Sequence, residues 1–202
     1  MPQQIPILDQ GEEVVSAPRP EILGLLYLTD FLSAEEEDDT VKQVDAAPWL
    51  DDLRRRVQHY GYKYDYKTRR VTASMRLGPL PLFVQRLAFR LLAEGVVREL
   101  PDQAIVNEYL PGQGISSHVD CEPCFGETIV TISLGSPCEM DFISLDTGQR
   151  CSRMLEPRSA LVLEGEARHR WTHGIKSRLN DYGVPRNRRI SLTFRRVTLR
   201  PA

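Results

Sequence analysis

Three residues in the second half of the chain have the chemistry of an iron site. His118 and Asp120 are two residues apart, so on an extended segment both side chains point to the same side and can reach one metal ion. His173 supplies a second imidazole. Two imidazoles and one carboxylate occupy one face of an octahedral ion and leave the other face open, as in non-heme Fe(II) oxygenases. We predict that these three residues bind the metal and are catalytic, with ordinary hydrogen bonding as the alternative.

Four further residues have the chemistry needed to bind a dicarboxylate. Arg189 begins the last predicted strand and can clamp a carboxylate bidentately, and Arg195 lies on the same face of that strand. Asn107 and Tyr109, two residues apart, precede His118 and also point one way. One amide, one phenol and two guanidinium groups suit the two carboxylates of 2-oxoglutarate. We therefore predict that Asn107, Tyr109, Arg189 and Arg195 bind this co-substrate.

The motifs that carry these residues resemble the core motifs of the AlkB family. The resemblance lies in residues 107–120, 171–175 and 189–195, and it extends from about residue 21 to 197. Within the family, residues 55–62 and 129–136 look most like the AlkB domain of the homologue that acts on the tRNA wobble uridine. That homologue adds an RNA-recognition module and a methyltransferase, for which this chain has no room.

The resemblance implies a double-stranded β-helix that binds Fe(II) at the two histidines and the aspartate. It also implies that Arg189 and Tyr109 hold the distal carboxylate of 2-oxoglutarate, while Asn107 and Arg195 lie near its chelating end. One departure is Ser191, where several relatives have Asn. A hydroxyl reaches less far than an amide, so we do not assign Ser191 a role.

A basic segment rich in tyrosine is our candidate for a substrate-binding flap. Residues 54–76 contain eight Lys or Arg and one Asp, and Tyr60, Tyr62, Tyr64 and Tyr66 alternate within it. On a strand, the four rings would share one face and could stack on bases among phosphate-binding cations. The alternative is that the rings are ordinary strand core. The residues that we expect to contact substrate are Arg55, Arg56, Tyr60, Tyr62 and Arg70.

The net charge of −2 conceals a segregation of charge along the chain. Residues 1–53 are strongly acidic, whereas residues 54–76 and 168–200 are strongly basic. Basic segments of this kind are typical of polyanion binding, although acidic and basic surfaces that face each other would also explain them. We expect nucleic acid as the partner, either RNA (tRNA in particular) or alkylated DNA.

No segment has the unbroken apolar run of a membrane helix, and the N-terminus does not look like a secretory signal. We therefore expect a cytoplasmic protein, or a nuclear one in a eukaryote. We also expect it to be a monomer. The four cysteines, at positions 121, 124, 138 and 151, are expected to be reduced thiols. The Cys121–Cys124 spacing leaves structural zinc open as an alternative.

The order of the predicted elements indicates an α+β domain. We expect a flexible arm over residues 1–20 and one dioxygenase domain over residues 21–202. A helix is predicted from Ser33 to about Ala46 and another over 81–94, followed by short strands. The predicted strands cover 22–27, 105–110, 128–134, 140–145, 160–163 and 190–197. The predicted fold is a double-stranded β-helix (jelly-roll) core with the N-terminal helices packed on one sheet.

These features together predict an Fe(II)- and 2-oxoglutarate-dependent dioxygenase that uses dioxygen to hydroxylate a carbon on a nucleic-acid base. The reaction would be oxidative demethylation of an alkylated base or hydroxylation of a modified tRNA uridine, with RNA favoured over DNA. The alternative is a 2-oxoglutarate-dependent hydroxylase or demethylase of protein side chains. That alternative explains the iron site but leaves the basic and aromatic segment without a role.

Overall fold

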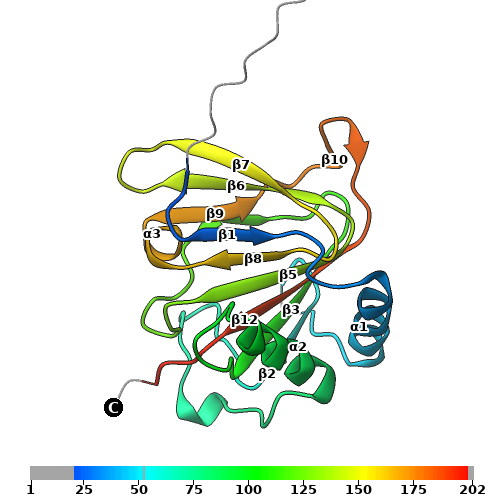
Figure 1. Cartoon of the computed structure of the whole chain (residues 1–202), viewed down its shortest axis with the longest axis vertical. Helices are drawn as coiled ribbons and strands as arrows, with labels where there is room; N and C mark the ends of the chain where they lie inside the picture. Colours follow the sequence, from blue (N-terminus) through cyan, green and yellow to red (C-terminus); the bar gives the residue numbers. More distant parts are fainter. Residues whose placement is uncertain (1–20, 52, 200–202) are drawn as a thin grey trace, which may run out of the picture.

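Two antiparallel β-sheets face each other and form the body of the molecule (Figure 1). The computed structural model describes residues 21–51 and 53–199. The predicted arm over residues 1–20 lies outside these residues. None of the helices in the described part is long and apolar enough to cross a membrane.

The major sheet has six strands in the spatial order β1-β8-β5-β12-β3-β2. These strands are β1 (Leu25–Leu28), β2 (Val57–Tyr60), β3 (Gln103–Tyr109), β5 (Ile129–Gly135), β8 (Ala160–Leu163) and β12 (Arg189–Arg195). The minor sheet has four strands in the order β4-β9-β6-β7. These are β4 (Ile115–His118), β6 (Cys138–Ser144), β7 (Arg150–Leu155) and β9 (Trp171–Ile175). A small hairpin pairs β10 (Asn180–Asp181) with β11 (Val184–Pro185). The arrangement confirms the predicted double-stranded β-helix.

Local sequence signals define the two long helices. Helix α1 (Ala34–Ala46) begins with a capping box, in which the Ser33 hydroxyl accepts from the Glu36 backbone N–H and the Glu36 carboxylate accepts from the Ser33 backbone N–H. Helix α2 (Leu82–Ala93) begins after Pro81 and ends before Gly95, which has a φ of +70°. Both boundaries agree with the predicted ones to within a residue or two. Two shorter helical segments, η1 (Ala73–Met75) and α3 (Gly165–His169), complete the structure.

The alternation of side chains along β12 separates the core from the site. Ile190, Leu192 and Phe194 are buried on the face that α1 and α2 cover. Arg189 and Arg195 lie on the opposite face, which looks toward the minor sheet. Because successive side chains on a strand point to opposite sides, one strand supplies both an apolar core and a polar cavity wall.

The predicted row of four tyrosine rings is not formed. Strand β2 ends at Tyr60, and the backbone at Gly61 adopts a φ of +77°. A Cβ at that position would lie 1.9 Å from the carbonyl oxygen of Asp102, so only glycine fits there. The chain turns at Gly61, and the period of two on which the prediction rested ends with it.

Candidate metal centre and substrate cavity

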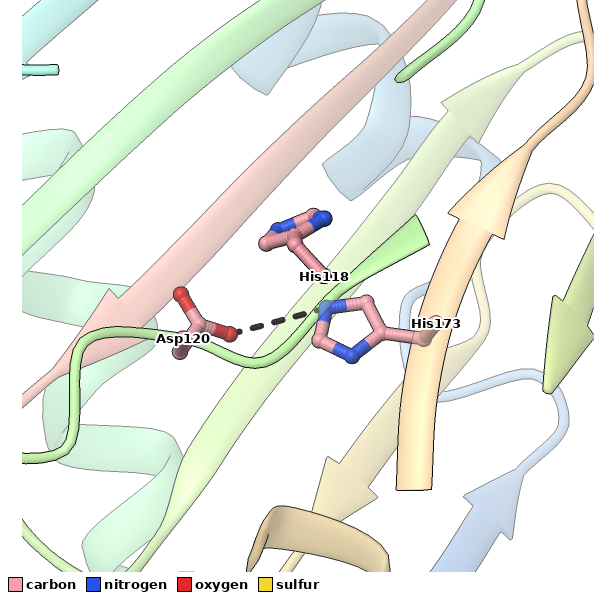
Figure 2. Close-up of side chains that lie close together, drawn as sticks. All are labelled: His118, Asp120 and His173. Carbon is pink, nitrogen blue, oxygen red and sulfur yellow. Dashed lines mark ion pairs between the residues drawn. The ribbon is translucent and has the colours of Figure 1, made fainter. Parts of the chain in front are cut away.

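His118, Asp120 and His173 converge between the two sheets (Figure 2). His118 ends β4 and lies opposite His173 on β9, and their ring centroids are 4.6 Å apart. Asp120 follows β4, and its Oδ2 lies 3.5 Å from Nε2 of His173. One ligand atom from each residue lies within 4.8 Å of the other two. This is the donor set that a facial site for a divalent iron ion requires.

The orientation of His118 is fixed by its own strand. Its Nδ1 lies 2.8 Å from the carbonyl oxygen of Ser116 and donates to it in the tautomer that this contact requires. Nε2 is then the unprotonated nitrogen and is able to bind a metal. Metal-binding histidines are commonly held by such a hydrogen bond from their second nitrogen.

Electrostatics keep the ligands in the protonation states that a cation needs. Burial by itself raises the pKa of the Asp120 carboxyl, but the charges of Arg195 and the two histidines outweigh it and hold this pKa well below its ordinary value. Burial lowers the pKa of His173 to about 4, against the opposing effect of Asp120. Near neutral pH, therefore, Asp120 is an anion and His173 is a neutral imidazole.

The residues predicted to bind 2-oxoglutarate form one wall of the same cavity. Arg195 donates to Asp120 Oδ1 at 2.6 Å, which places it beside the metal ligands. Arg189 donates to the Ser133 hydroxyl at 2.9 Å, and its guanidinium lies 5.3 Å from the centre of the Tyr109 ring. In both arginines the Nε is buried and lacks a hydrogen-bond partner within the described structure. Each therefore retains a donor for a bound carboxylate, and the residues present fit 2-oxoglutarate.

A cavity of about 1190 Å³ joins this wall to the metal ligands. Its inner part is lined by Asn107, Tyr109, Ser191 and both arginines. Cations from separate segments line it as well: Arg54, Arg55, Arg69, Arg150 and Lys176. A cavity of this size exceeds what a five-carbon dicarboxylate fills, so it has room for a second, larger substrate.

The structure brings only one of the five predicted substrate residues into this cavity. Arg55 lines it, but its Nε donates to Asn107 Oδ1 at 2.8 Å, so it lies among the residues predicted for 2-oxoglutarate. Arg56 instead pairs with Glu108 at 2.6 Å. Tyr60 packs edge-on against Phe83.

Tyr62 and Arg70 also lie away from the cavity. Tyr62 lines a separate cavity of about 340 Å³. Arg70 is exposed, and its backbone pairs with that of Asp65. The predicted set of substrate contacts is therefore not assembled as a unit.

Two tyrosines that we did not assign to the substrate line the cavity instead. Tyr64 and Tyr66 pack edge to face with centroids 5.0 Å apart, and Tyr64 also contacts Phe125 at 5.5 Å. Burial raises the pKa of Tyr66, which stays protonated at neutral pH. Within the predicted flap over 54–76, residues 61–76 carry these rings, and from here on the name flap is used for residues 61–76 alone. Gly61 was the signal in the sequence that could have shown this, because a glycine inside a strand pattern indicates a turn between Tyr60 and the two tyrosines Tyr64 and Tyr66.

The expectation of four reduced thiols is wrong for one pair, because Cys121 and Cys124 form a disulfide. Cys138 is buried and unbridged, and Cys151 is partly exposed and unbridged. The structural-zinc alternative is not supported, since the one group of potential metal ligands in residues 21–51 and 53–199 is His118, Asp120 and His173.

Comparisons with known proteins agree with this geometry. Residues 24–195 match the model of the 2OG-Fe(II) oxygenase superfamily. The chain is 37% identical to "Alkylated DNA repair protein ALKBH8 homolog" of Arabidopsis thaliana, covering 89% of this chain and 60% of that protein. It is 39% identical to "tRNA (carboxymethyluridine(34)-5-O)-methyltransferase ALKBH8" of Macaca fascicularis, covering 81% of this chain and 26% of that protein.

A solved structure supports the fold. OsALKBH1 superposes with a TM-score of 0.65 at 19% identity, and the match covers 89% of this chain and all of the other. The chain spans 60% and 26% of the lengths of the two curated relatives above. The similarity to these relatives over most of the chain agrees with its AlkB-like motifs. The family match, the fold and the metal-ligand set together show that the chain belongs to the 2OG-Fe(II) oxygenase superfamily, whose reaction uses Fe(II), 2-oxoglutarate and dioxygen.

Proposed function

We propose that His118, Asp120 and His173 bind Fe(II) and that Arg189 and its neighbours bind 2-oxoglutarate. When bound, these groups supply the oxidation of a C–H bond by dioxygen, coupled to decarboxylation of 2-oxoglutarate to succinate. The protein orients the co-substrate through Arg189 and Tyr109 and holds Asp120 through Arg195. Its remaining task is to place one carbon of the substrate beside the iron and to exclude water.

We propose further that this carbon belongs to a nucleic-acid base. The observation that carries the proposal is the ring of five cations around the cavity, to which the flap adds two aromatic rings. Apart from the ligand Asp120, the one carboxylate among the described residues that line the cavity is Asp141, which lies 3.1 Å from the ammonium group of Lys176. Cations of this kind bind phosphates, while tyrosine rings stack on an unpaired base.

RNA, and tRNA in particular, is the substrate that we favour over alkylated DNA. One relative is named for a methyltransferase acting on tRNA carboxymethyluridine-34, whereas another is named for repair of alkylated DNA. The open cavity with stacking rings suits a base in a single-stranded loop, which is where proteins read RNA sequence. The reaction would be either hydroxylation of a modified uridine or oxidative demethylation.

The test is a comparison of nucleosides before and after treatment with the iron-loaded enzyme. Total tRNA, total RNA and methylated DNA would be digested and analysed by mass spectrometry, with succinate measured in parallel and Asp120→Ala as the inactive control. Loss of one modified nucleoside, or gain of its hydroxylated form, matched by succinate would support the proposal. Succinate release stimulated by protein but by no nucleic acid would replace it with the protein side-chain hydroxylase.

The proposal includes a monomeric state, a cytoplasmic or nuclear location, and a single dioxygenase domain over residues 21–202. Light scattering at micromolar concentration checks the first, and microscopy of the tagged protein checks the second. Expression of residues 21–202 alone, followed by a thermal unfolding measurement, checks whether this range folds by itself.

A further inference from the structure

The loop after Asp120 connects the metal site to the flap. Cys121 follows this ligand directly and is bonded to Cys124. Both cysteines are buried, at 4% and 5% exposure, and Cys121 is one of the residues that line the cavity. A disulfide between residues only three apart closes a very short loop, so it removes little entropy from the unfolded chain and is a poor structural cross-link.

Arginines hold this loop from two sides. On one side, the buried Arg168 donates to the carbonyl oxygens of Asp120, at 3.0 Å, and Cys121, at 3.4 Å. On the flap side, the carbonyl oxygen of Arg69 lies 3.3 Å from Sγ of Cys121 and 3.4 Å from Sγ of Cys124. The Arg69 side chain also donates to the carbonyl oxygen of Val119 at 3.2 Å. The two sulfurs therefore lie at the joint between loop and flap.

The oxidation state of the sulfurs decides whether they add hydrogen bonds to the one that the Arg69 side chain makes across this joint. A thiol is a weak donor, so in the reduced state the pair can donate to the Arg69 carbonyl. A disulfide has no hydrogen to donate. Oxidation therefore removes the two hydrogen bonds that the thiols can donate to that carbonyl.

We propose that Cys121 and Cys124 form a redox-modification site that controls how tightly the flap is held over the cavity. The oxidant is a low-molecular-weight disulfide of the glutathione class, which enters through the cavity. Sγ of Cys121 attacks one sulfur of the oxidant, which breaks the oxidant's S–S bond and releases one glutathione thiol. Sγ of Cys124 then attacks Cys121 Sγ, forms the protein disulfide and releases the second thiol. The two protein thiols lose two electrons and two protons, and both pass to glutathione.

The inference is tested without substrate, so it stands or fails independently of the proposed function. The full chain would be equilibrated over a range of glutathione to glutathione disulfide ratios, trapped with a maleimide and analysed by mass spectrometry. Trypsin would then be added to the fully reduced and fully oxidised forms. The flap has exposed cleavage sites at Lys67, Arg69 and Arg70, whose rate of cutting reports its opening.

We expect the 121–124 disulfide to form and to be reduced reversibly, and the flap to be cut about threefold faster in the oxidised form, as the removal of one net hydrogen bond predicts. The double variant Cys121→Ser, Cys124→Ser keeps hydroxyl donors but cannot form a disulfide. Its flap should therefore be cut at the slow rate of the reduced protein under both reducing and oxidising conditions. The matched control Cys138→Ala, Cys151→Ala should respond as the unmodified chain does.

Two outcomes would overturn the proposal. A pair that stays reduced, or stays oxidised, across all ratios is not a redox-modification site. Equal cutting of the two forms of the unmodified chain shows that the pair does not control the flap. Both measurements use the unmodified chain, so they remain decisive even if the serine variant does not fold.

Discussion

His118 and His173 are direct cross-strand partners on β4 and β9, although 55 residues separate them in the sequence. Opposite positions on antiparallel strands place Cβ atoms about 5 Å apart, so the pairing alone brings both rings to one point. Asp120 is added where the chain leaves β4. The metal site therefore depends on the register of β4 against β9, and a slip of one residue would turn one ring to the other face.

Asp120 and His173 are predicted to be essential for metal binding. Asp120→Ala or His173→Ala should weaken binding of Fe(II), or of Co(II) as a stable substitute, by about 100-fold or more, because even residues that only support a metal ligand contribute 10- to 100-fold. Anaerobic calorimetry measures this directly. His169→Ala is the matched control, since this histidine pairs with the exposed Glu122 and Glu127 and is not in the group of metal ligands. Unchanged affinity in the Asp120 variant would disprove the assignment.

Arg189 is predicted to dominate the affinity for 2-oxoglutarate. Removal of one partner of a buried charge pair costs about 3–5 kcal/mol, so Arg189→Ala should weaken 2-oxoglutarate binding by about 100-fold or more. The affinity for Fe(II) should change little. An unchanged Fe(II) affinity shows that the loss of 2-oxoglutarate binding does not result from damage to the metal site. Arg189→Lys keeps the charge but loses the bidentate fork, and should recover only part of the affinity.

Arg196→Ala, at an exposed position next to β12, is the control for the Arg189 variants. Neighbouring arginines cannot readily replace Arg189, because Arg186 is paired with Asp181 and Arg188 with Asp45. An Arg189→Ala protein with unchanged half-saturation by 2-oxoglutarate would show that another group holds the distal carboxylate.

The metal-free protein should lose stability in mild acid because of His173. The pKa of this residue is about 4 in the folded protein and about 6.5 in an exposed histidine. Between these values the unfolded chain binds the proton and the folded chain does not, so the free energy of unfolding falls as pH falls from about 6.5 to 4. Asp120, whose pKa is lowered, adds to the loss only below about pH 4.

Thermal unfolding across this range, without metal, provides the measurement. His173→Gln removes the titrating group, so its melting temperature should vary less between pH 6.5 and 4.5 than that of the unmodified chain. The same variation in both proteins would mean that other groups cause the acid sensitivity.

The two long helices and the strands of the major sheet other than β2 were predictable because their signals are local. Ser33 and Glu36 form a capping box, and Gly95 takes the left-handed conformation that ends α2. Strands β4, β7 and β9 of the minor sheet were missed. β7 shows no alternation of buried and exposed residues, since four of its six positions are half-buried. Such a pattern results from tertiary contacts and has no signature in the sequence.

The metal and co-substrate residues were predictable because side chains that bind one ligand from one strand must be an even number of residues apart. The His118-x-Asp120 pair and the two arginines of β12 lie together on one cavity, as their period of two requires. The flap was not predictable in the same way. Its tyrosines alternate, but the close approach of Gly61 to Asp102 ends the strand after Tyr60. The tyrosines do alternate in the sequence, but they do not lie on one continuous strand. Tyr60 and Tyr62 therefore face other parts of the molecule.

The rings of Tyr64 and Tyr66 are therefore predicted to stack on the substrate base. Tyr64→Ala and Tyr66→Ala should each weaken oligonucleotide binding by about 1–3 kcal/mol, while the corresponding Phe variants should lose much less. Tyr60→Phe is the control, because this ring packs against Phe83 in the core. Fluorescence anisotropy with a labelled single strand gives the affinities. Equal losses in the Phe and Ala variants would assign the effect to the hydroxyl instead.

The cations around the cavity are predicted to set the salt dependence of substrate binding. Arg54→Ala, Arg150→Ala should reduce the slope of log affinity against log salt for single strands by about 0.7 for each phosphate that is no longer neutralised. Uncoupled consumption of 2-oxoglutarate should continue, because neither residue belongs to the wall formed by Arg189 and Arg195. The control is Arg86→Ala, an exposed cation on α2, which covers the other face of the major sheet.

The measurement is a titration of a labelled RNA oligonucleotide at several salt concentrations, repeated with DNA of the same sequence. Electrostatic contacts with phosphate do not distinguish the two nucleic acids, so the change in slope should be the same for both. Any preference for RNA must then persist in the double variant, because it comes from contacts to the base and the 2′-hydroxyl within the cavity. If the double variant binds RNA with the slope of the unmodified chain, the cations do not contact phosphate. A protein substrate then becomes the better hypothesis.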